Sequence, residues 1–240
     1  MKAFLAALAV LTALAALSAP ARADEYAFKR TLDFTIGTAG TTALSVAGQN
    51  GNIHLMGDGG STIRVHAVLG ARSADALRAL DVTQTRSGNT VRIADVCPAT
   101  RRLVFWTVAD CDIELDVHYP RSLAVGLRNE NGNTVIDGAA SALSVANGNG
   151  NIRVNGAGGP LSVKNGNGNV SATLAKNWRG SAITMHTNAG NVHLRVPRGF
   201  AATVTAKVTL GEVRNTADVR KGPATVNATT TFGNVVISQR

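Results

Sequence analysis

The chain has 240 residues and carries 24 Lys or Arg against 15 Asp or Glu, which gives a formal net charge of +9 at pH 7. After Asp24 no apolar run approaches the roughly 18 residues of a membrane-spanning helix, so such a helix is excluded from the rest of the chain. A basic protein of this kind favours anionic partners.

The first 23 residues have the pattern of a secretory signal peptide. Lys2 provides a positive start, residues 3–17 form an apolar run, and Ala21-Arg22-Ala23 is a small-x-small cleavage site. We therefore expect export to the periplasm or beyond, with 217 of the 240 residues and a net charge of +7 left in the mature chain. No cysteine lies near the cleavage site, so a lipid anchor is not expected.

Residues 24–128 predict a β-rich part with one short helix. The expected strands are 28–36, 42–46, 52–56, 62–69, 81–85, 90–96, 103–108 and 112–119. Ser73 fits the N-cap of a helix over residues 73–80, in which Leu77 and Leu80 share one face. We expect this part to cover one end of the repeats that follow, because the open end of a repeat stack needs a cap.

Two turn signals and one early repeat lie within this part. Ser87-Gly88-Asn89 predicts a hairpin between the strands at 81–85 and 90–96. Residues 103–108 and 112–119 predict a second hairpin. Gln49-Asn50-Gly51-Asn52 is a first copy of the phrase that recurs later in the chain.

Cys97 and Cys111 are the only two cysteines. In an oxidising compartment such a pair predicts a disulfide, which for a loop of this size stabilises a fold by about 3 kcal/mol. A redox-active pair would need the close spacing of a C-x-x-C motif, which is absent. The expected bridge is therefore structural.

From residue 129 to residue 240 one glycine- and asparagine-rich phrase recurs. Its turn glycines are Gly132, Gly150, Gly168, Gly190, Gly211 and Gly233. They follow one another at intervals of 18 to 22 residues. A period of about 20 residues that carries short apolar runs indicates a stacked repeat protein.

Each repeat predicts one short strand before the phrase and one after it. Leu143 and Val145, for example, precede the phrase at Gly150, and Ile152 and Val154 follow it, so that the apolar side chains of each strand face one side. Glycine and asparagine tolerate the positive φ of a tight turn, and stacked asparagines can form a hydrogen-bonded ladder. Two all-β arrangements remain open: a β-solenoid resembling a right-handed β-helix, which the regular period favours, or a series of two-residue hairpins.

The recurring Asn-Gly-Asn-(Ile/Val)-x-(Val/Leu) resembles the bacterial putative-adhesin family of β-strand-repeat domains, a domain of unknown function. The strand ends Tyr119-Pro120-Arg121 and Val196-Pro197-Arg198-Gly199 are similar to that family's as well. The resemblance covers most of the mature chain. It implies an exported, β-helix-like envelope protein without catalytic residues to transfer to this chain.

The search for reactive chemistry finds no convincing site. Asn stands where a calcium-binding repeat needs Asp, and from residue 131 onward the only acids are Asp137, Glu212 and Asp218. Asp110, Asp112, Glu114 and Asp116 alternate, but a solvated, salt-bridged face explains them without the carboxylate pair of a glycosidase. His186 and His193 lack a third zinc ligand. We therefore predict no catalytic residue, cofactor or metal.

The remaining candidate is a binding face. Arg153, Arg195 and Arg214 each follow a core residue after the phrase, so they could stack on one outer sheet face and contact an anionic envelope glycan or lipopolysaccharide. A solvated face that opposes aggregation is the alternative. The sequence thus predicts an exported, non-enzymatic, adhesin-like scaffold whose partner is such a ligand or another envelope protein, and not nucleic acid. A polysaccharide-acting β-helix enzyme and a purely structural accessory are the alternatives.

Overall fold

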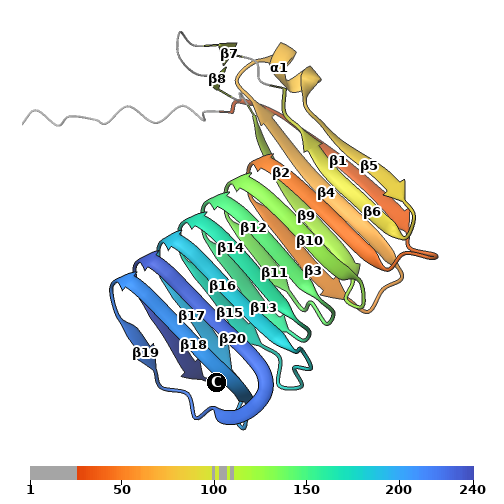
Figure 1. The fold of residues 1–240 in the computed structure, drawn as a ribbon. Helices are drawn as coiled ribbons and strands as arrows, with labels where there is room; N and C mark the ends of the chain where they lie inside the picture. The colour runs from red at the N-terminus through yellow and green to blue at the C-terminus, as the bar shows by residue number, and fades with distance from the viewer. Residues whose placement is uncertain (1–25, 99–100, 103–106, 109–110) are drawn as a thin grey trace, which may run out of the picture.

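The computed structural model describes residues 26–98, 101–102, 107–108 and 111–240. The predicted signal peptide lies outside these residues, and so do residues 103–106 of the strand predicted at 103–108. Two large mixed sheets hold almost all of the described chain (Figure 1).

The first of them, sheet A, contains ten strands within the described residues. In spatial order these are β1 (Phe28–Gly37), β4 (Thr62–Ala71), β9 (Asp112–Pro120), β3 (Ile53–Asp58), β11 (Thr134–Asp137), β13 (Ile152–Ala157), β15 (Val170–Leu174), β17 (Val192–Val196), β21 (Val235–Gln239) and β19 (Val213–Asn215). Sheet B contains nine described strands. These are β18 (Ala201–Leu210), β20 (Arg220–Phe232), β16 (Ala182–Ala189), β14 (Leu161–Asn167), β12 (Leu143–Asn149), β10 (Ala124–Asn131), β2 (Ala43–Asn50), β6 (Thr90–Val96) and β5 (Asp81–Ser87).

The two strands that flank each glycine turn lie in different sheets. β12 pairs with β10 and β14 in sheet B, while β13, which follows the turn at Gly150, pairs with β11 and β15 in sheet A. All of these pairs are parallel. The alternative of repeated hairpins is therefore wrong, because each strand bonds to the equivalent strand of another repeat and not to its neighbour in sequence.

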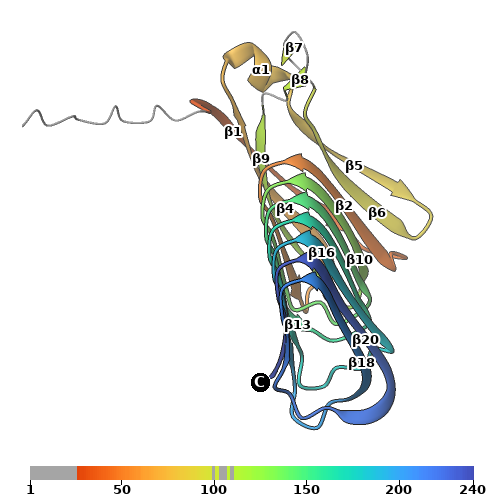
Figure 2. The ribbon, with the colours of Figure 1, turned by 60° about the vertical axis from the view of Figure 1, so that its left-hand side comes forward.

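The hydrophobic core lies between the two sheets, which the turns join along one edge (Figure 2). Side chains alternate in each strand, so Leu143 and Val145 point inward from β12 and are buried, whereas Ser144 is exposed. Because the strands are parallel, equivalent residues of successive repeats lie side by side, and Val145 lies beside Val163 of β14. The predicted all-β class and its two-residue periodicity are confirmed.

The early copy of the phrase belongs to the same array. β2 pairs in parallel with β10, and β3 pairs in parallel with β11, so residues 43–58 stack directly against residues 124–137. The predicted boundary between residues 128 and 129 falls inside β10.

The helix and the first hairpin of the N-terminal part form as predicted. Ser73 caps the helix α1 (Ala74–Ala79), its hydroxyl accepting a hydrogen bond of 3.1 Å from the Ala76 N–H. β5 and β6 form an antiparallel pair. Helices able to span a membrane are absent from the described residues, where α1 has only six residues.

The second predicted hairpin is wrong. β9, which contains residues 112–119, pairs antiparallel with β4 and parallel with β3. β8 (Thr107–Val108) pairs instead with β7 (Arg101–Arg102). Ile113, Leu115 and Val117 of β9 are buried in the core. As an internal strand of sheet A, β9 can pack these side chains into the core, which an isolated two-stranded hairpin could not do.

Cys97 and Cys111 form the predicted disulfide, with their Cα atoms 6.0 Å apart. Both residues are buried. The bridge ties the end of β6 in sheet B to the start of β9 in sheet A, beside the stacked repeats.

At the C-terminal end the repeats do not stack in chain order. β20 lies between β16 and β18, and β21 lies between β17 and β19, so the last repeat in sequence is inserted before the one that precedes it. The side chains explain this order. Thr230 of β20 donates a hydrogen bond of 2.9 Å to the Gly190 carbonyl, whereas Val208, which holds the same register position in β18, has no donor. The repeat that carries Val208 is therefore suited to the outermost place.

Candidate functional site

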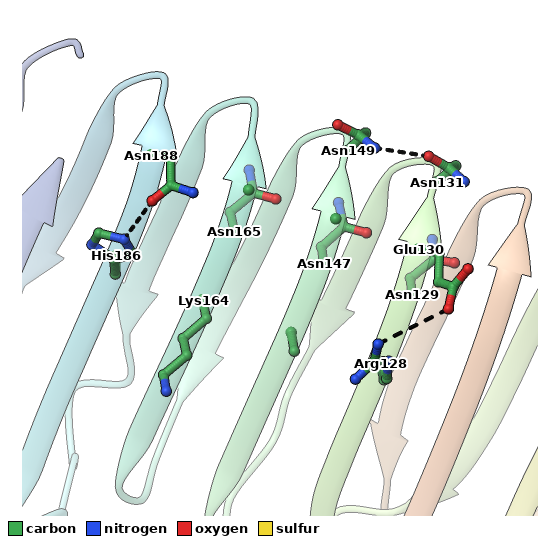
Figure 3. Close-up of a pocket in the computed structure, with 13 residues that line it drawn as sticks. Arg128, Asn129, Glu130, Asn131, Asn147, Asn149, Lys164, Asn165, His186 and Asn188 are labelled. Atoms are coloured by element: carbon green, nitrogen blue, oxygen red, sulfur yellow. Dashed lines mark hydrogen bonds and ion pairs between the residues drawn. The ribbon is translucent and has the colours of Figure 1, made fainter. Parts of the chain in front are cut away.

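A polar groove lies on the outer face of sheet B, close to the row of turns (Figure 3). It crosses β10, β12, β14 and β16 and has a volume of about 600 Å³. Its principal side chains are those of Arg128, Glu130, Asn131, Asn149, Lys164, His186 and Asn188.

Small residues make the floor of the groove. Arg128, Ala146, Lys164 and His186 hold one register position on four neighbouring strands, so the short Ala146 leaves a gap between Arg128 and Lys164. Gly148 lies two residues along β12. A side chain at Gly148 would collide with the carbonyl of Glu130, so close strand packing requires glycine here.

Asparagine side chains form the rim of the groove. Asn149 donates a hydrogen bond of 2.9 Å to the side-chain oxygen of Asn131, and Asn167 donates one of 2.8 Å to Asn149. This is the ladder that the repeated phrase predicts. The amides of Asn149 and Asn167 each use one of their two N–H groups in these bonds, so each retains a donor for a ligand.

The tautomer of His186 follows from its two partners. Its Nε2 lies 2.9 Å from the side-chain oxygen of Asn188, which can only accept, so Nε2 carries the proton in the neutral ring. Its Nδ1 lies 2.9 Å from the Thr229 hydroxyl, which then donates. The arrangement leaves the amide nitrogen of Asn188 facing the groove.

Arg128 and Lys164 give the groove a positive charge. Glu130 is the only acidic residue among the described residues of its lining, and it lies 4.0 Å from Arg128 in an exposed pair. Lys164 has no ion-pair partner among the residues that the structure describes. Cations beside amide donors can bind carboxylate, sulfate or phosphate together with hydroxyl groups. A single carboxylate cannot provide the pair that glycoside hydrolysis requires.

The three arginines predicted as a binding face are all on the outer side of sheet A, away from this groove. Arg153 and Arg214 share one register position, but Ser171, His193 and Val236 separate them. Four strand spacings correspond to about 19 Å. Arg195 lies two residues along its strand, level with Thr173. The structure therefore places the three on one face without bringing them together.

A second hollow, of about 510 Å³, lies on the outer face of sheet A over β1, β4 and β9. Asp33, His66, Asp116 and His54 follow one another across β1, β4, β9 and β3. His66 Nδ1 is 2.7 Å from Asp33, and His54 Nε2 is 2.8 Å from Asp137. The hydrogen bond to Asp33 raises the pKa of His66 above its usual value.

This Asp–His row was not apparent from the sequence. Its residues are far apart in the chain, and only the pairing of β1, β4, β9 and β3 aligns them. His186 and His193, weighed as a zinc pair, lie on different sheets and face away from each other. Within the described residues, no group of three or more His, Cys, Asp or Glu is arranged to hold a metal ion.

The fold is similar to that of a solved bacterial protein. A putative cell adhesion protein from Clostridium sporogenes matches with a TM-score of 0.51 and 10% identity, over 89% of this chain and 100% of its own. A putative adhesin from Bacteroides fragilis matches with a TM-score of 0.39 and 14% identity, over 90% of this chain and 99% of its own. A putative adhesin from Parabacteroides distasonis matches with a TM-score of 0.29 and 11% identity, over 88% of this chain and 97% of its own.

No family model and no curated protein matches the chain. The resemblance drawn from the repeated phrase is confirmed at the level of the fold, by the likeness to the Clostridium sporogenes protein.

Proposed function

We propose that this chain is an exported, non-enzymatic, adhesin-like protein of the cell envelope that binds an anionic envelope glycan or lipopolysaccharide in the groove of sheet B. The groove carries the proposal, because it combines two cations with a rim of amide donors on neighbouring strands. Parallel stacking of the repeats supports its description as a β-solenoid, a rigid rod that presents such a surface along its length.

The spacing of the cations suits an extended polymer. Arg128 and Lys164 are on β10 and β14, two strands apart, which corresponds to about 9.6 Å. A chain that runs across the strands can place one acidic group at each cation and its hydroxyl groups at Asn131 and Asn149. A flat, open groove of this kind binds a long chain better than a small molecule, which would leave most of its surface in water.

Binding to alginate, a carboxylated polysaccharide, tests the proposal, with neutral dextran as the control ligand. The double variant Arg128→Ala/Lys164→Ala should raise the Kd for alginate at least tenfold, the effect of about 1.4 kcal/mol. Raising the salt concentration should weaken binding by the wild type, since exposed charges are screened.

The arginines of sheet A provide a matched control. Arg153→Ala/Arg195→Ala removes the same charge from the opposite outer face and should leave the Kd within twofold. A greater loss in this variant than in the groove variant would transfer the site to the predicted arginine face, which also includes Arg214. Absence of binding to alginate and to lipopolysaccharide would leave the structural accessory as the better account.

Export has its own test. Expression with the native N-terminus should yield a periplasmic or secreted protein whose first residue is Asp24, as determined by N-terminal sequencing. A full-length cytoplasmic product would contradict this part of the proposal.

The enzyme alternative has one observation in its favour, which is the presence of Asp33 and Asp116 in the hollow of sheet A. Their side chains are 69% and 53% exposed, so neither lies in the water-excluding surroundings that a general acid needs. Release of reducing ends from a polysaccharide by the wild type, and its loss in Asp116→Asn, would favour the enzyme. We expect no release.

A further inference from the structure

Three cationic residues lie at the edge of the stack opposite the glycine turns. Lys176, Arg198 and Arg240 line a pocket of about 460 Å³ together with Pro197. They follow β15, β17 and β21, which are neighbours in sheet A. The pocket is separate from the groove of sheet B and shares no residue with it.

Backbone geometry brings the three residues to one place. Thr173 is level with Arg195, and Lys176 and Arg198 each lie three residues farther along, in the turns that follow β15 and β17. Val196 is level with Gln239, and the Arg240 N–H donates a hydrogen bond of 2.9 Å to the Val196 carbonyl. Neighbouring backbones in a sheet are about 4.8 Å apart, so the three side chains leave from adjacent positions.

Tight turns hold Lys176 and Arg198 in place. The Trp178 N–H donates to the Ala175 carbonyl at 3.2 Å, which closes the turn that contains Lys176. The Phe200 N–H donates to the Pro197 carbonyl at 3.3 Å, which closes the turn that contains Arg198. Gly199 has φ of 72° in that turn, a value that glycine adopts readily.

The two turns are packed against each other. The rings of Trp178 and Phe200 are in edge-to-face contact, with centroids 5.3 Å apart. Trp178 also donates a hydrogen bond of 2.7 Å from Nε1 to the Gly159 carbonyl. The pocket is therefore built on an anchored base.

None of the described residues that line this pocket has an acidic side chain. Among the residues that the structure describes, Lys176, Arg198 and Arg240 have no side-chain hydrogen bond or ion pair. All three residues are exposed, so an anion from solution can reach them and be attracted by all three charges at once.

The chemistry of the three groups indicates the class of anion. Arginine presents a planar fork of N–H donors that matches phosphate oxygens, and lysine adds a point charge. A phosphate monoester carries a charge of about −1.5 to −2 and three acceptor oxygens, whereas a carboxylate carries a single charge. We propose that Lys176, Arg198 and Arg240 form a binding site for a phosphate group, carried either by a lipid headgroup or by a soluble ligand.

Two probes distinguish these sources when used with the full mature chain. Inorganic pyrophosphate in calorimetry reports a soluble ligand. Cosedimentation with phosphatidylcholine vesicles that contain phosphatidic acid, compared with phosphatidylcholine alone, reports a headgroup. Binding to either probe supports the site, and the stronger probe identifies the source.

Variants decide whether the pocket is responsible. Lys176→Ala/Arg198→Ala should weaken binding to the better probe at least tenfold. Arg179→Ala/Lys221→Ala removes the same charge from exposed positions outside the pocket and should change binding less than twofold. Equal losses in the two variants, or no binding to either probe at low salt, would overturn the proposal. The groove variant Arg128→Ala/Lys164→Ala should bind phosphate normally, so the test is independent of glycan binding.

Discussion

The side-chain amide of Asn165 donates a hydrogen bond of 3.0 Å to the Gly150 carbonyl of the neighbouring repeat. Four residues at equivalent positions form the same kind of bond: Asn129, Asn147, Thr187 and Thr230. All five side chains are buried at the edge where the two sheets meet. A backbone carbonyl there is shielded from water, so each repeat supplies a donor to the turn beside it.

Replacement of Asn165 should show that this position needs a donor more than it needs an amide. Asn165→Val leaves the Gly150 carbonyl without a partner and should lower the free energy of unfolding by about 1–3 kcal/mol. Asn165→Thr copies the residue used at Thr187 and should lose about half as much or less. Urea denaturation measures both, and equal losses would show that packing alone matters.

The turn glycines and the other positive-φ glycines should respond differently to alanine. Gly150 has φ of 131°, and a Cβ there would overlap the Gly132 carbonyl. Gly156 has φ of 73°, and a Cβ there would meet nothing within 4 Å.

Gly156→Ala should therefore cost only about 1–2 kcal/mol, the strain of left-handed backbone. Gly150→Ala should cost more than about 4 kcal/mol, since the neighbouring backbone must also move. Thermal and urea unfolding provide the comparison. Similar values for the two variants would show that the stack can adjust at its turns.

The order of the last repeats can be tested by disulfide trapping. Thr184 of β16 is level with Asn227 of β20, which in turn is level with Thr205 of β18. A Thr184→Cys/Asn227→Cys variant should form a disulfide, because bridged Cα atoms are usually 4.4–6.8 Å apart. Thr184→Cys/Thr205→Cys spans two strand spacings, about 9.6 Å, and should not. Mass spectrometry without reduction detects the bridge. A disulfide in the second variant and none in the first would show that the repeats stack in chain order, with β18 beside β16.

The pair His66–Asp33 should make stability depend on pH. Because the pKa of His66 is raised in the folded state, the pair stabilises the protein fully below the unfolded value of about 6.5. This contribution is lost as the pH rises through the folded pKa. Asp33→Asn should thus lower the Tm at pH 5.5 but leave it nearly unchanged at pH 9.

Asp81→Asn is a suitable control for that measurement, because it removes an exposed carboxylate whose ion-pair partner is an arginine, Arg30, and not a histidine. Its effect on Tm should be similar at pH 5.5 and pH 9. A difference as large as that of Asp33→Asn would assign the pH dependence to the overall charge of the protein.

Several local features follow from neighbouring residues and were predictable. The alternation of Leu143 and Val145 with Ser144 defines a strand, and the period of the glycines defines the repeats. The bridge between Cys97 and Cys111 followed from cysteine usage. The hairpin placed at residues 103–119 failed because β9 bonds to β4 and β3, which are distant in sequence. The residue types of β9 do not identify those partners.

The candidate sites show the same division. Arg128 and Lys164 carry no signal that separates them from other exposed basic residues until parallel pairing places them around Ala146. The sequence does contain an indication that β20 is inserted before β18. Val208 and Glu212 occupy positions that hydrogen-bonding side chains occupy in other repeats. Recognising it required knowledge of what each ladder residue bonds to.

The amino-acid sequence by itself determined the local geometry of this protein: extended segments of two-residue period, positive-φ turns at glycine, and a disulfide between two cysteines. The first two depend on the conformational preferences of a few adjacent residues, and the third on the presence of only two cysteines. Only the tertiary structure decided which strands are neighbours, and hence which side chains share a groove, an Asp–His row or a cluster of cations. Strand pairing joins residues far apart in the chain, and the hydrogen bonds between backbones are the same whatever side chains they carry.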